Sequence, residues 1–210
     1  MNATQIITHL SLLMGASWCA GINLYATVAV LGLMNKYTSF HLPPEMQVLS
    51  NNWVMWPAVV LYFVEFIADK IPAVDSVWDT FHTFIRVPAG AALAAMAIGD
   101  VPVEAQLFAG LIGGTLALGS HTTKATTRLA AHATGTSPIV SPVVSVVEDV
   151  FVVGTMGLLA THPLVALVGI ALTMVAAYFI LKAFWKLARK VWRGLFGGRS
   201  PRREEMVSYA

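Results

Sequence analysis

Residues 119 to 149 read GSHTTKATTRLAAHATGTSPIVSPVVSVVED, and this stretch decides how the rest of the chain is interpreted. It carries basic, imidazole and acidic side chains, whereas the segments on both sides of it are apolar and long enough for membrane helices. Ionisable groups at membrane depth are costly, so they usually face a protein interior or a water-filled cavity. The stretch therefore predicts a polar site inside an apolar helical protein.

The composition indicates an integral membrane protein. The 210 residues are 57% hydrophobic and 11% charged, whereas soluble domains carry roughly 25% charged residues. A chain of this length is expected to form one domain. The single cysteine, Cys19, excludes an internal disulfide and a multi-cysteine metal site. We expect neither a metal nor a cofactor.

The basic residues concentrate at one end, because 8 of the 13 Lys and Arg residues lie at or after Lys182. Such a bias marks the cytoplasmic side of a membrane protein. Apolar and Trp residues interleave with these cations over residues 181–196, which favours an amphipathic helix on anionic lipid over nucleic-acid binding. We therefore expect the lipid bilayer as a partner, a bacterial inner (plasma) membrane location with the C-terminus cytoplasmic, and a disordered polar tail over residues 197–210.

Apolar segments predict an all-α, polytopic fold with about six transmembrane helices. The expected spans are residues 6–34, 53–71, 73–99, 103–119, 138–161 and 163–185. They form a single membrane domain over residues 1–196, with halves at about 6–99 and 103–185.

The two halves show signs of an internal repeat. Residues 21–27 are weakly similar to residues 119–126, and each half carries an embedded acid, Glu65 or Glu148. This predicts a 3+3 inverted repeat with broken helices, an arrangement that places the site of many transporters at the interface of the repeats. Breaks are expected near Gly21 and Asn23 and again in the 119–126 segment, with both chain ends cytoplasmic.

Several motifs together resemble those of a known family. They are Gly21-x-Asn23-x-Tyr25-Ala26-Thr27, Glu65-x-x-Ala68-Asp69-Lys70-x-Pro72-x-x-Asp75-x-x-Trp78-Asp79, Arg86-x-Pro88-Ala89-Gly90, His121-x-x-Lys124-Ala125-x-x-Arg128, Ser137-Pro138 and Ser145-x-x-Glu148-Asp149. Over roughly residues 15–160 the chain resembles the domain-of-unknown-function family four-one-two-six, a group of small multi-pass membrane proteins. The resemblance implies a membrane setting and no particular activity.

The first half supplies acids near the end of its second span. Glu65 lies four residues deeper than Asp69, and a carboxylate at membrane depth can exchange protons or bind cations. The alternative is a helix end that reaches the headgroups, with Lys70 extending to the surface. The next segment places four polar side chains on one helical stripe, which either lines a polar vestibule or is the wet face of an interfacial helix. These four are Asp75, Asp79, His82 and Arg86.

The second half supplies bases and a pair of adjacent acids. Lys124 and Arg128 share one helical face, where they either form an anion site or neutralise the acids of the first half. Glu148 and Asp149 lie near the middle of a span and project about 100° apart, so we expect one to pair with a base and the other to titrate. The candidate binding residues are therefore Asn23, Tyr25, Glu65, Asp69, Asp75, Asp79, His82, Arg86, His121, Lys124, Arg128, Ser145, Glu148 and Asp149.

These features favour a small proton- or cation-coupled transporter or permease for a small anionic solute or a lipid headgroup. Glu65 and Glu148 would carry the coupling ion, and Lys124 and Arg128 would attract the anion. Two alternatives stay open. One is a structural or assembly protein whose buried charges lock helices together. The other is an intramembrane lipid-modifying enzyme, although no nucleophile motif, HExxH or phosphatase signature is present, and we assign no catalytic residue. A homo-oligomer also stays open.

Overall fold

The computed structural model describes residues 2–196, apart from the side chains of Pro72, Ala73, Asp75, Ser76 and residues 194–196. The predicted disordered tail, residues 197–210, lies outside the described residues. Within the described part the regular elements are all helices, as predicted. They are α1 (Ala3–Ile22), α2 (Leu24–Tyr37), the 3-10 helix η1 (Pro44–Ser50), α3 (Asn52–Ala68), α4 (Pro72–Ala97), α5 (Val103–Ala133), α6 (Ser137–Thr161) and α7 (Pro163–Phe196).

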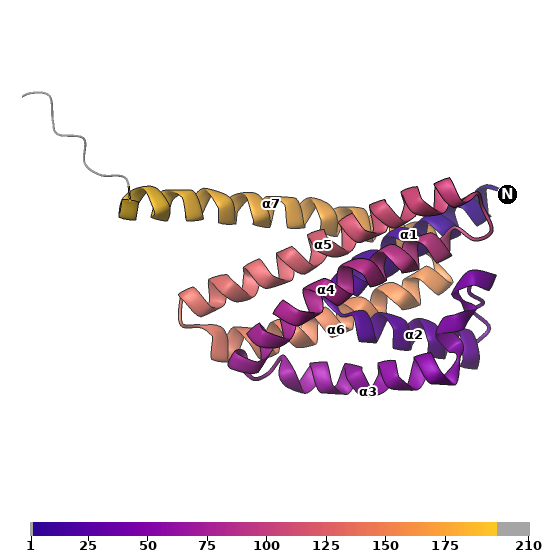
Figure 1. The fold of residues 1–210 in the computed structure, drawn as a ribbon, viewed down its shortest axis with the longest axis horizontal. Coiled ribbons are helices and arrows are strands. Elements are labelled where there is room, and N and C mark those ends of the chain that lie inside the picture. The colour runs from indigo at the N-terminus through magenta and orange to yellow at the C-terminus, as the bar shows by residue number, and fades with distance from the viewer. Residues whose placement is uncertain (1, 197–210) are drawn as a thin grey trace, which may run out of the picture.

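The helices have the length and composition expected of a membrane protein. Helices α1, α5, α6 and α7 are each long and apolar enough to cross a membrane, and α3 is apolar but only 17 residues long. Figure 1 shows α3 to α7 running along the long axis of a bundle, each opposite in direction to the one before. The membrane class is therefore supported, whereas the predicted number of six spans is not confirmed.

The first predicted span, residues 6–34, is a helical hairpin. Helix α1 ends at Ile22 and α2 begins at Leu24. Near the start of α1, His9 Nδ1 lies 2.6 Å from the carbonyl oxygen of Ala97 at the end of α4. After α2, Glu45 Oε2 lies 3.5 Å from where a Cβ would stand on Gly99, two residues beyond Ala97. Both arms therefore open at the same end of the bundle, and the tip lies inside it (Figure 1). We call this element the α1–α2 hairpin.

The tip of the hairpin depends on two residues of the first motif. Asn23 has an extended backbone with φ −144° and ψ 98°, its N–H donates to Cys19 O at 2.8 Å, and its Oδ1 accepts from Ala26 N at 2.9 Å. It thus ends α1 and caps α2, a position where Asn is favoured. A Cβ on Gly21 would stand 2.1 Å from Ala117 O of α5, so only glycine allows this approach. The predicted break near Gly21 and Asn23 is present.

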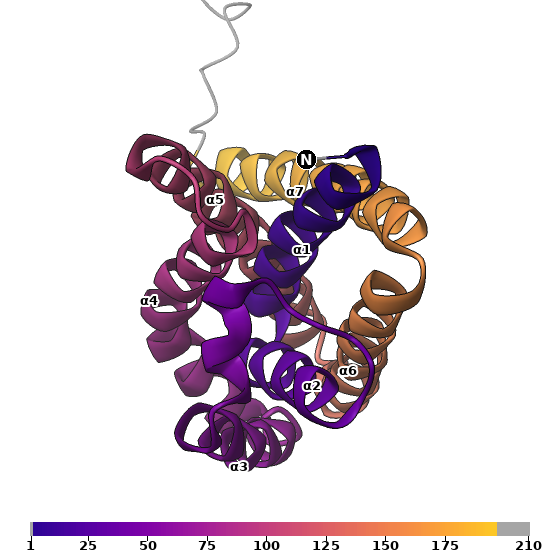
Figure 2. The ribbon, with the colours of Figure 1, turned by 90° about the vertical axis from the view of Figure 1, so that its right-hand side faces the viewer.

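Small residues bring α1, α4 and α5 into close contact. A Cβ on Gly90 of α4 would stand 2.4 Å from Ala117 Cβ, and one on Gly113 of α5 would stand 2.2 Å from Ala94 Cβ. Ser17 Oγ of α1 donates to Gly90 O at 2.9 Å. Small residues at such contacts are typical of helix packing in membranes. Figure 2 looks along the bundle and shows these three helices beside one another, with α2, α3 and α6 lower in the view.

The predicted break in the 119–126 segment is absent. Helix α5 continues without interruption through 31 residues, from Val103 to Ala133, and so extends well beyond the predicted end at residue 119. Thr122, Thr123 and Thr127 donate to carbonyls four residues earlier, and the charged side chains find partners on other helices. Because these polar side chains all have partners, the helix does not have to break to expose them to water. The inverted repeat with a broken helix in each half is therefore not observed.

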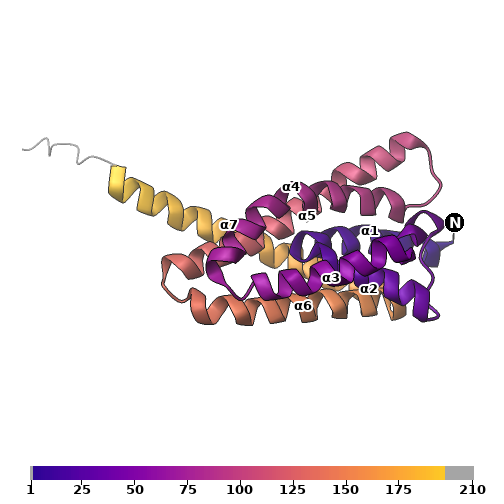
Figure 3. The same cartoon turned by 60° about the horizontal axis from the view of Figure 1, so that its bottom comes forward.

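The two ends of the chain differ from the expectation as well. Figure 1 places the N-terminus and the last turns of α7 at opposite ends of the bundle, whereas both ends were expected on one side. The physical reason is the α1–α2 hairpin, which returns the chain to the end from which it entered. Figure 3 shows that α7 diverges from the bundle toward its C-terminal end. Of the residues in its most apolar 18-residue stretch, only 17% are buried.

Candidate functional site

Seven charged side chains from four helices meet beyond the tip of the α1–α2 hairpin. The four helices are α3, α4, α5 and α6, and all of the side chains except that of Glu148 belong to residues that are buried in the bundle. We call this group the ionic network. Its members are Glu65, Asp69, Asp79, Arg86, Lys124, Arg128 and Glu148.

Lys124 of α5 lies at the centre of the ionic network. Its Nζ is 3.5 Å from Glu65 Oε1, 3.4 Å from Asp69 Oδ2 and 3.4 Å from Glu148 Oε2. It also donates to Ile22 O, the last carbonyl of α1, at 3.1 Å. Helix C-termini carry unsatisfied carbonyls and a partial negative charge, so the ammonium group caps α1 while it joins carboxylates of α3 and α6.

Arg86 of α4 is fully buried and pairs with two acids. It forms a salt bridge with Glu65, and its Nη1 lies 2.9 Å from Asp79 Oδ1. Nη1 also lies 2.9 Å from His121 Nδ1. A guanidinium group can only donate, so Nδ1 accepts and the ring proton is on Nε2. Nε2 then donates to Thr83 Oγ1 at 2.6 Å, which ties α5 to α4.

Arg128 of α5 joins three helices. Its two terminal nitrogens donate to the two carboxylate oxygens of Asp69, at 2.9 and 3.2 Å, in the bidentate geometry that favours Arg over Lys. Its Nη2 also donates to Glu148 Oε2 at 3.0 Å, and Nη1 lies 3.6 Å from Asp79 Oδ2. The expectation that one acid of the Glu148–Asp149 pair would contact Lys124 or Arg128 matches this geometry, because Glu148 contacts both.

The hairpin tip is hydrogen-bonded to the residues around the ionic network. Asn23 Nδ2 donates to Asp149 Oδ1 of α6 at 3.0 Å. His82 Nδ1 lies 2.7 Å from Trp78 O, which can only accept, so Nε2 accepts the hydroxyl proton of Tyr25 at 2.9 Å. The uncharged tip of the hairpin is thus held by a carboxylate on one side and an imidazole on the other.

The charges of the ionic network do not balance. It contains four acids, Glu65, Asp69, Asp79 and Glu148, and three bases, Arg86, Lys124 and Arg128. Glu65 is fully buried, and its Oε2 has no hydrogen-bond partner among the described residues. A buried carboxylate oxygen without a partner bears most of its desolvation cost. With all seven groups ionised the network has one negative charge in excess, and it has an acceptor atom that is not used.

Two hollows border the ionic network, and they share no lining residue. The first has a volume of about 260 Å³, lies between α4 and α5, and is lined by Asp79, Thr83, His121 and Arg128 among others. The second has a volume of about 240 Å³ and is lined by polar residues of α5 and α6 and by apolar residues of α1, α6 and α7. Its charged lining residues are Lys124 and Glu148. Members of the network thus line both a hollow with mostly polar residues and a largely apolar one.

The structure brings together almost all of the residues that the sequence singled out. Ser145 Oγ donates to Asp69 Oδ2 at 3.4 Å, which adds it to the group. The side chain of Asp75 is outside the described part of the chain. Lys70 does not join the ionic network: its Nζ donates to Phe66 O at 2.8 Å, in line with the interpretation of a lysine at a helix end. Sequence reasoning missed Thr83, although its place three residues before Arg86 put it beside the predicted stripe.

Comparison with known proteins finds a family match that extends over most of the chain. A family model described as Domain of unknown function (DUF4126) matches residues 10–183. The chain belongs to this family. The resemblance noted from the motifs is confirmed, and the match includes the α1–α2 hairpin from residue 10 onward and every member of the ionic network. No curated protein and no solved structure shows a significant match to the chain. The family description names no activity.

Proposed function

We propose that the protein is a small membrane permease coupled to protons or to a monovalent cation, and that the ionic network binds the coupling ion. The observation that supports this proposal most directly is the unpartnered, fully buried Oε2 of Glu65 in a group with more acids than bases. Buried charges that lack a partner are unfavourable. A proton or a cation bound at Glu65 would remove the excess charge.

The two hollows support a path through the network. Asp79 lines one hollow and Glu148 lines the other, and Lys124 lies within 3.9 Å of both carboxylates. An ion that binds at either acid competes with the ammonium group for the same oxygens. Lys124 then shifts toward the remaining carboxylates, so occupancy of one hollow is linked to the charge that faces the other.

The α1–α2 hairpin is the element that we expect to respond. Its tip touches the network through Ile22 O and touches Asp149 through Asn23. Interrupted helices at membrane depth are tolerated where they are buried in protein or line a cavity, and many transporters build their sites from them. Neutralisation of Asp149 or of the network weakens these contacts and so changes how firmly the tip is held.

The solute would bind in the hollows and not in the network itself. Arg86, Lys124 and Arg128 each contact at least two carboxylates, so an anion would have to displace an acid from them. We propose a small anionic solute or a lipid headgroup as the cargo. We also propose a bacterial plasma-membrane location with the basic C-terminal end cytoplasmic, which places the N-terminus on the opposite side (Figure 1).

Proteoliposomes that contain the purified chain test this proposal. Under an imposed pH gradient a trapped pH dye, and under an imposed sodium or potassium gradient a trapped dye selective for that cation, should report ion movement that is at least about tenfold slower in Glu65→Gln and in Glu148→Gln, because the substituted amide can neither release a proton nor offer a charged oxygen to a cation. The matched control is Glu104→Gln, an exposed acid in the first turn of α5, which should leave the rate unchanged. Monodisperse elution and an unchanged melting temperature show that each variant is folded.

Infrared spectroscopy gives a readout that needs no cargo. A buried carboxylic acid that gains or loses its proton as pH changes gives a C=O band that is absent in the matching Gln variant. If folded Glu65→Gln and Glu148→Gln proteins keep the wild-type flux and pH dependence, and the band is unchanged, the proposal is wrong.

A structural role is the second candidate, because the same salt bridges join four helices. If the charges only lock helices together, Lys124→Met should lower expression by leaving four acids with two bases, and adding Glu148→Gln, which removes one of the acids that Lys124 contacts, should restore it. Restored folding together with unchanged ion flux in the double variant would favour the structural role over transport.

A further inference from the structure

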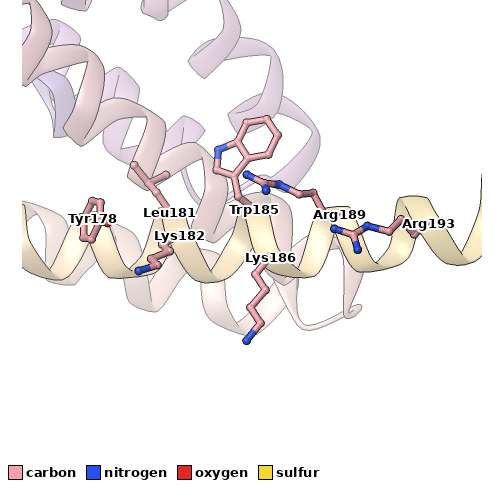
Figure 4. Close-up of a pocket in the computed structure, with 7 residues that line it drawn as sticks. All are labelled: Tyr178, Leu181, Lys182, Trp185, Lys186, Arg189 and Arg193. Atoms are coloured by element: carbon pink, nitrogen blue, oxygen red, sulfur yellow. The ribbon is translucent and has the colours of Figure 1, made fainter.

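The C-terminal half of α7 carries a basic face that is separate from the ionic network. Between residues 182 and 193 there are five cations and no acid, and four of these cations line a hollow of about 480 Å³ together with Tyr178, Leu181 and Trp185. Figure 4 shows these side chains along one stretch of the helix. We call the four the α7 basic stripe, and its members are Lys182, Lys186, Arg189 and Arg193.

The α7 basic stripe contrasts with the cations of the ionic network. Its members are separated by four, three and four residues, a spacing at which like charges on a helix repel one another. In the part of the chain that the structure describes, none of the four forms a salt bridge, whereas each cation of the ionic network contacts at least two carboxylates. The stripe is therefore exposed and available to a negative partner from outside this part of the chain.

The position of the stripe corresponds to a membrane surface. Lys182 comes 19 residues after Pro163, the first residue of α7. At 1.5 Å per residue this is roughly 28 Å of helix, close to the hydrocarbon thickness of about 30 Å. The first cation therefore stands where the apolar part of α7 leaves the bilayer. Tyr178 and Trp185 flank it, as aromatic residues commonly do at that depth.

The same segment also exposes an apolar face. Leu187 and Val191 lie on the side of the helix away from the stripe and are 60% and 53% exposed. A soluble polyanion such as RNA would neutralise the cations and leave these side chains in water. A membrane of anionic phospholipid supplies phosphates for the cations and acyl chains for the apolar face, so it satisfies both.

We propose that the α7 basic stripe is a binding site for anionic phospholipid, with the headgroup phosphate held in the hollow of Figure 4. In Figure 4 Lys186 and Arg189 extend away from each other, so both side chains would turn toward the phosphate to donate to it, Arg189 in the bidentate manner of guanidinium groups. The site does not involve the ionic network, so it stands whether or not the protein is a permease.

A titration of the detergent-solubilised full chain with a fluorescent phosphatidylglycerol tests the proposal, with the matching phosphatidylcholine as the neutral comparison. Phosphatidylglycerol should bind at least about tenfold more tightly at low salt, and the difference should shrink at 0.5 M salt, about where charges a few ångströms apart are screened. The variant Lys182→Gln/Lys186→Gln/Arg189→Gln/Arg193→Gln should lose the preference and bind the two lipids about equally, because it lacks the cations that attract an anionic headgroup.

The matched control removes four charges from the same end of the chain but outside the stripe. It is Lys190→Gln/Arg199→Gln/Arg202→Gln/Arg203→Gln, and it should keep most of the preference for phosphatidylglycerol. If the control loses as much as the stripe variant, net charge and not the stripe attracts the lipid, and the proposal is overturned. Equal binding of both lipids, or displacement of phosphatidylglycerol by an RNA oligonucleotide at equal phosphate concentration, also overturns it.

Discussion

Replacing Arg86 with methionine should destabilise the helical bundle far more than the same change at the surface. Arg86 is fully buried, and its loss removes the salt bridge to Glu65, the 2.9 Å contact with Asp79 and the 2.9 Å hydrogen bond to His121. Glu65 is then left with Lys124 at 3.5 Å as its cation. Breaking a buried pair in this way costs about 3–5 kcal/mol, because the remaining charge stays buried.

The free energy of unfolding, measured in mixed micelles with increasing sodium dodecyl sulfate, would show this loss. Adding Glu65→Gln to Arg86→Met removes the stranded charge and should recover about half of it or more. The control Arg189→Met changes an exposed arginine on α7 and should cost roughly 0.5 kcal/mol or less. A cost below about 1 kcal/mol for Arg86→Met, or no recovery with Glu65→Gln, would refute the account of a buried ionic network.

Three further changes test the α1–α2 hairpin. Gly21→Ala should lower the free energy of unfolding by about 1–3 kcal/mol, because the new Cβ would stand 2.1 Å from Ala117 O. The control Gly154→Ala on α6 has nothing within 4 Å of its new Cβ and should be neutral or slightly stabilising. Equal effects of the two changes would contradict the close approach of α1 and α5. Asn23→Ala removes a helix cap and the hydrogen bond to Asp149 and should cost about 2–4 kcal/mol, compared in the same assay with Asn2→Ala, which removes a cap on the exposed end of α1. Tyr25→Phe should cost about 1 kcal/mol through the lost bond to His82, and Tyr178→Phe, which is 59% exposed, should cost nothing measurable.

The ionic network was largely predictable because its members are conspicuous in an apolar sequence. Glu65, Lys124, Arg128 and Glu148 each interrupt or border a hydrophobic run, and charge at that depth requires a partner. Helical spacing then placed Lys124 on the same face as Arg128. Which acid pairs with which base could not be predicted, since the partners come from four helices and their distances depend on packing.

The α1–α2 hairpin was harder to predict, because its signal consists of very few residues. Asn23 alone ends one helix and starts the next, and Gly21 matters only through its contact with α5. A single Asn in an apolar run is equally consistent with a hydrogen bond between two continuous helices. In α5 the prediction was wrong, because the threonine-rich segment was expected to break and is continuous helix. Its hydroxyls bond within the helix, and its charges are neutralised by other helices.

The hairpin also has an electrical property that follows from its sequence. Residues 1–35 contain no Asp, Glu, Lys or Arg, and yet the tip meets an ammonium group at Ile22 O and a carboxylate at Asn23. The end of α1 presents the negative pole of a helix dipole to the ammonium group, and the side-chain amide of Asn23, at the positive start of α2, donates to the carboxylate, so the tip accommodates both signs without a charged residue. The tip, in contrast to the open end with Lys36, therefore has no formal charge of its own. A movement confined to the tip would carry no formal charge through the membrane potential, so voltage would not act on it directly.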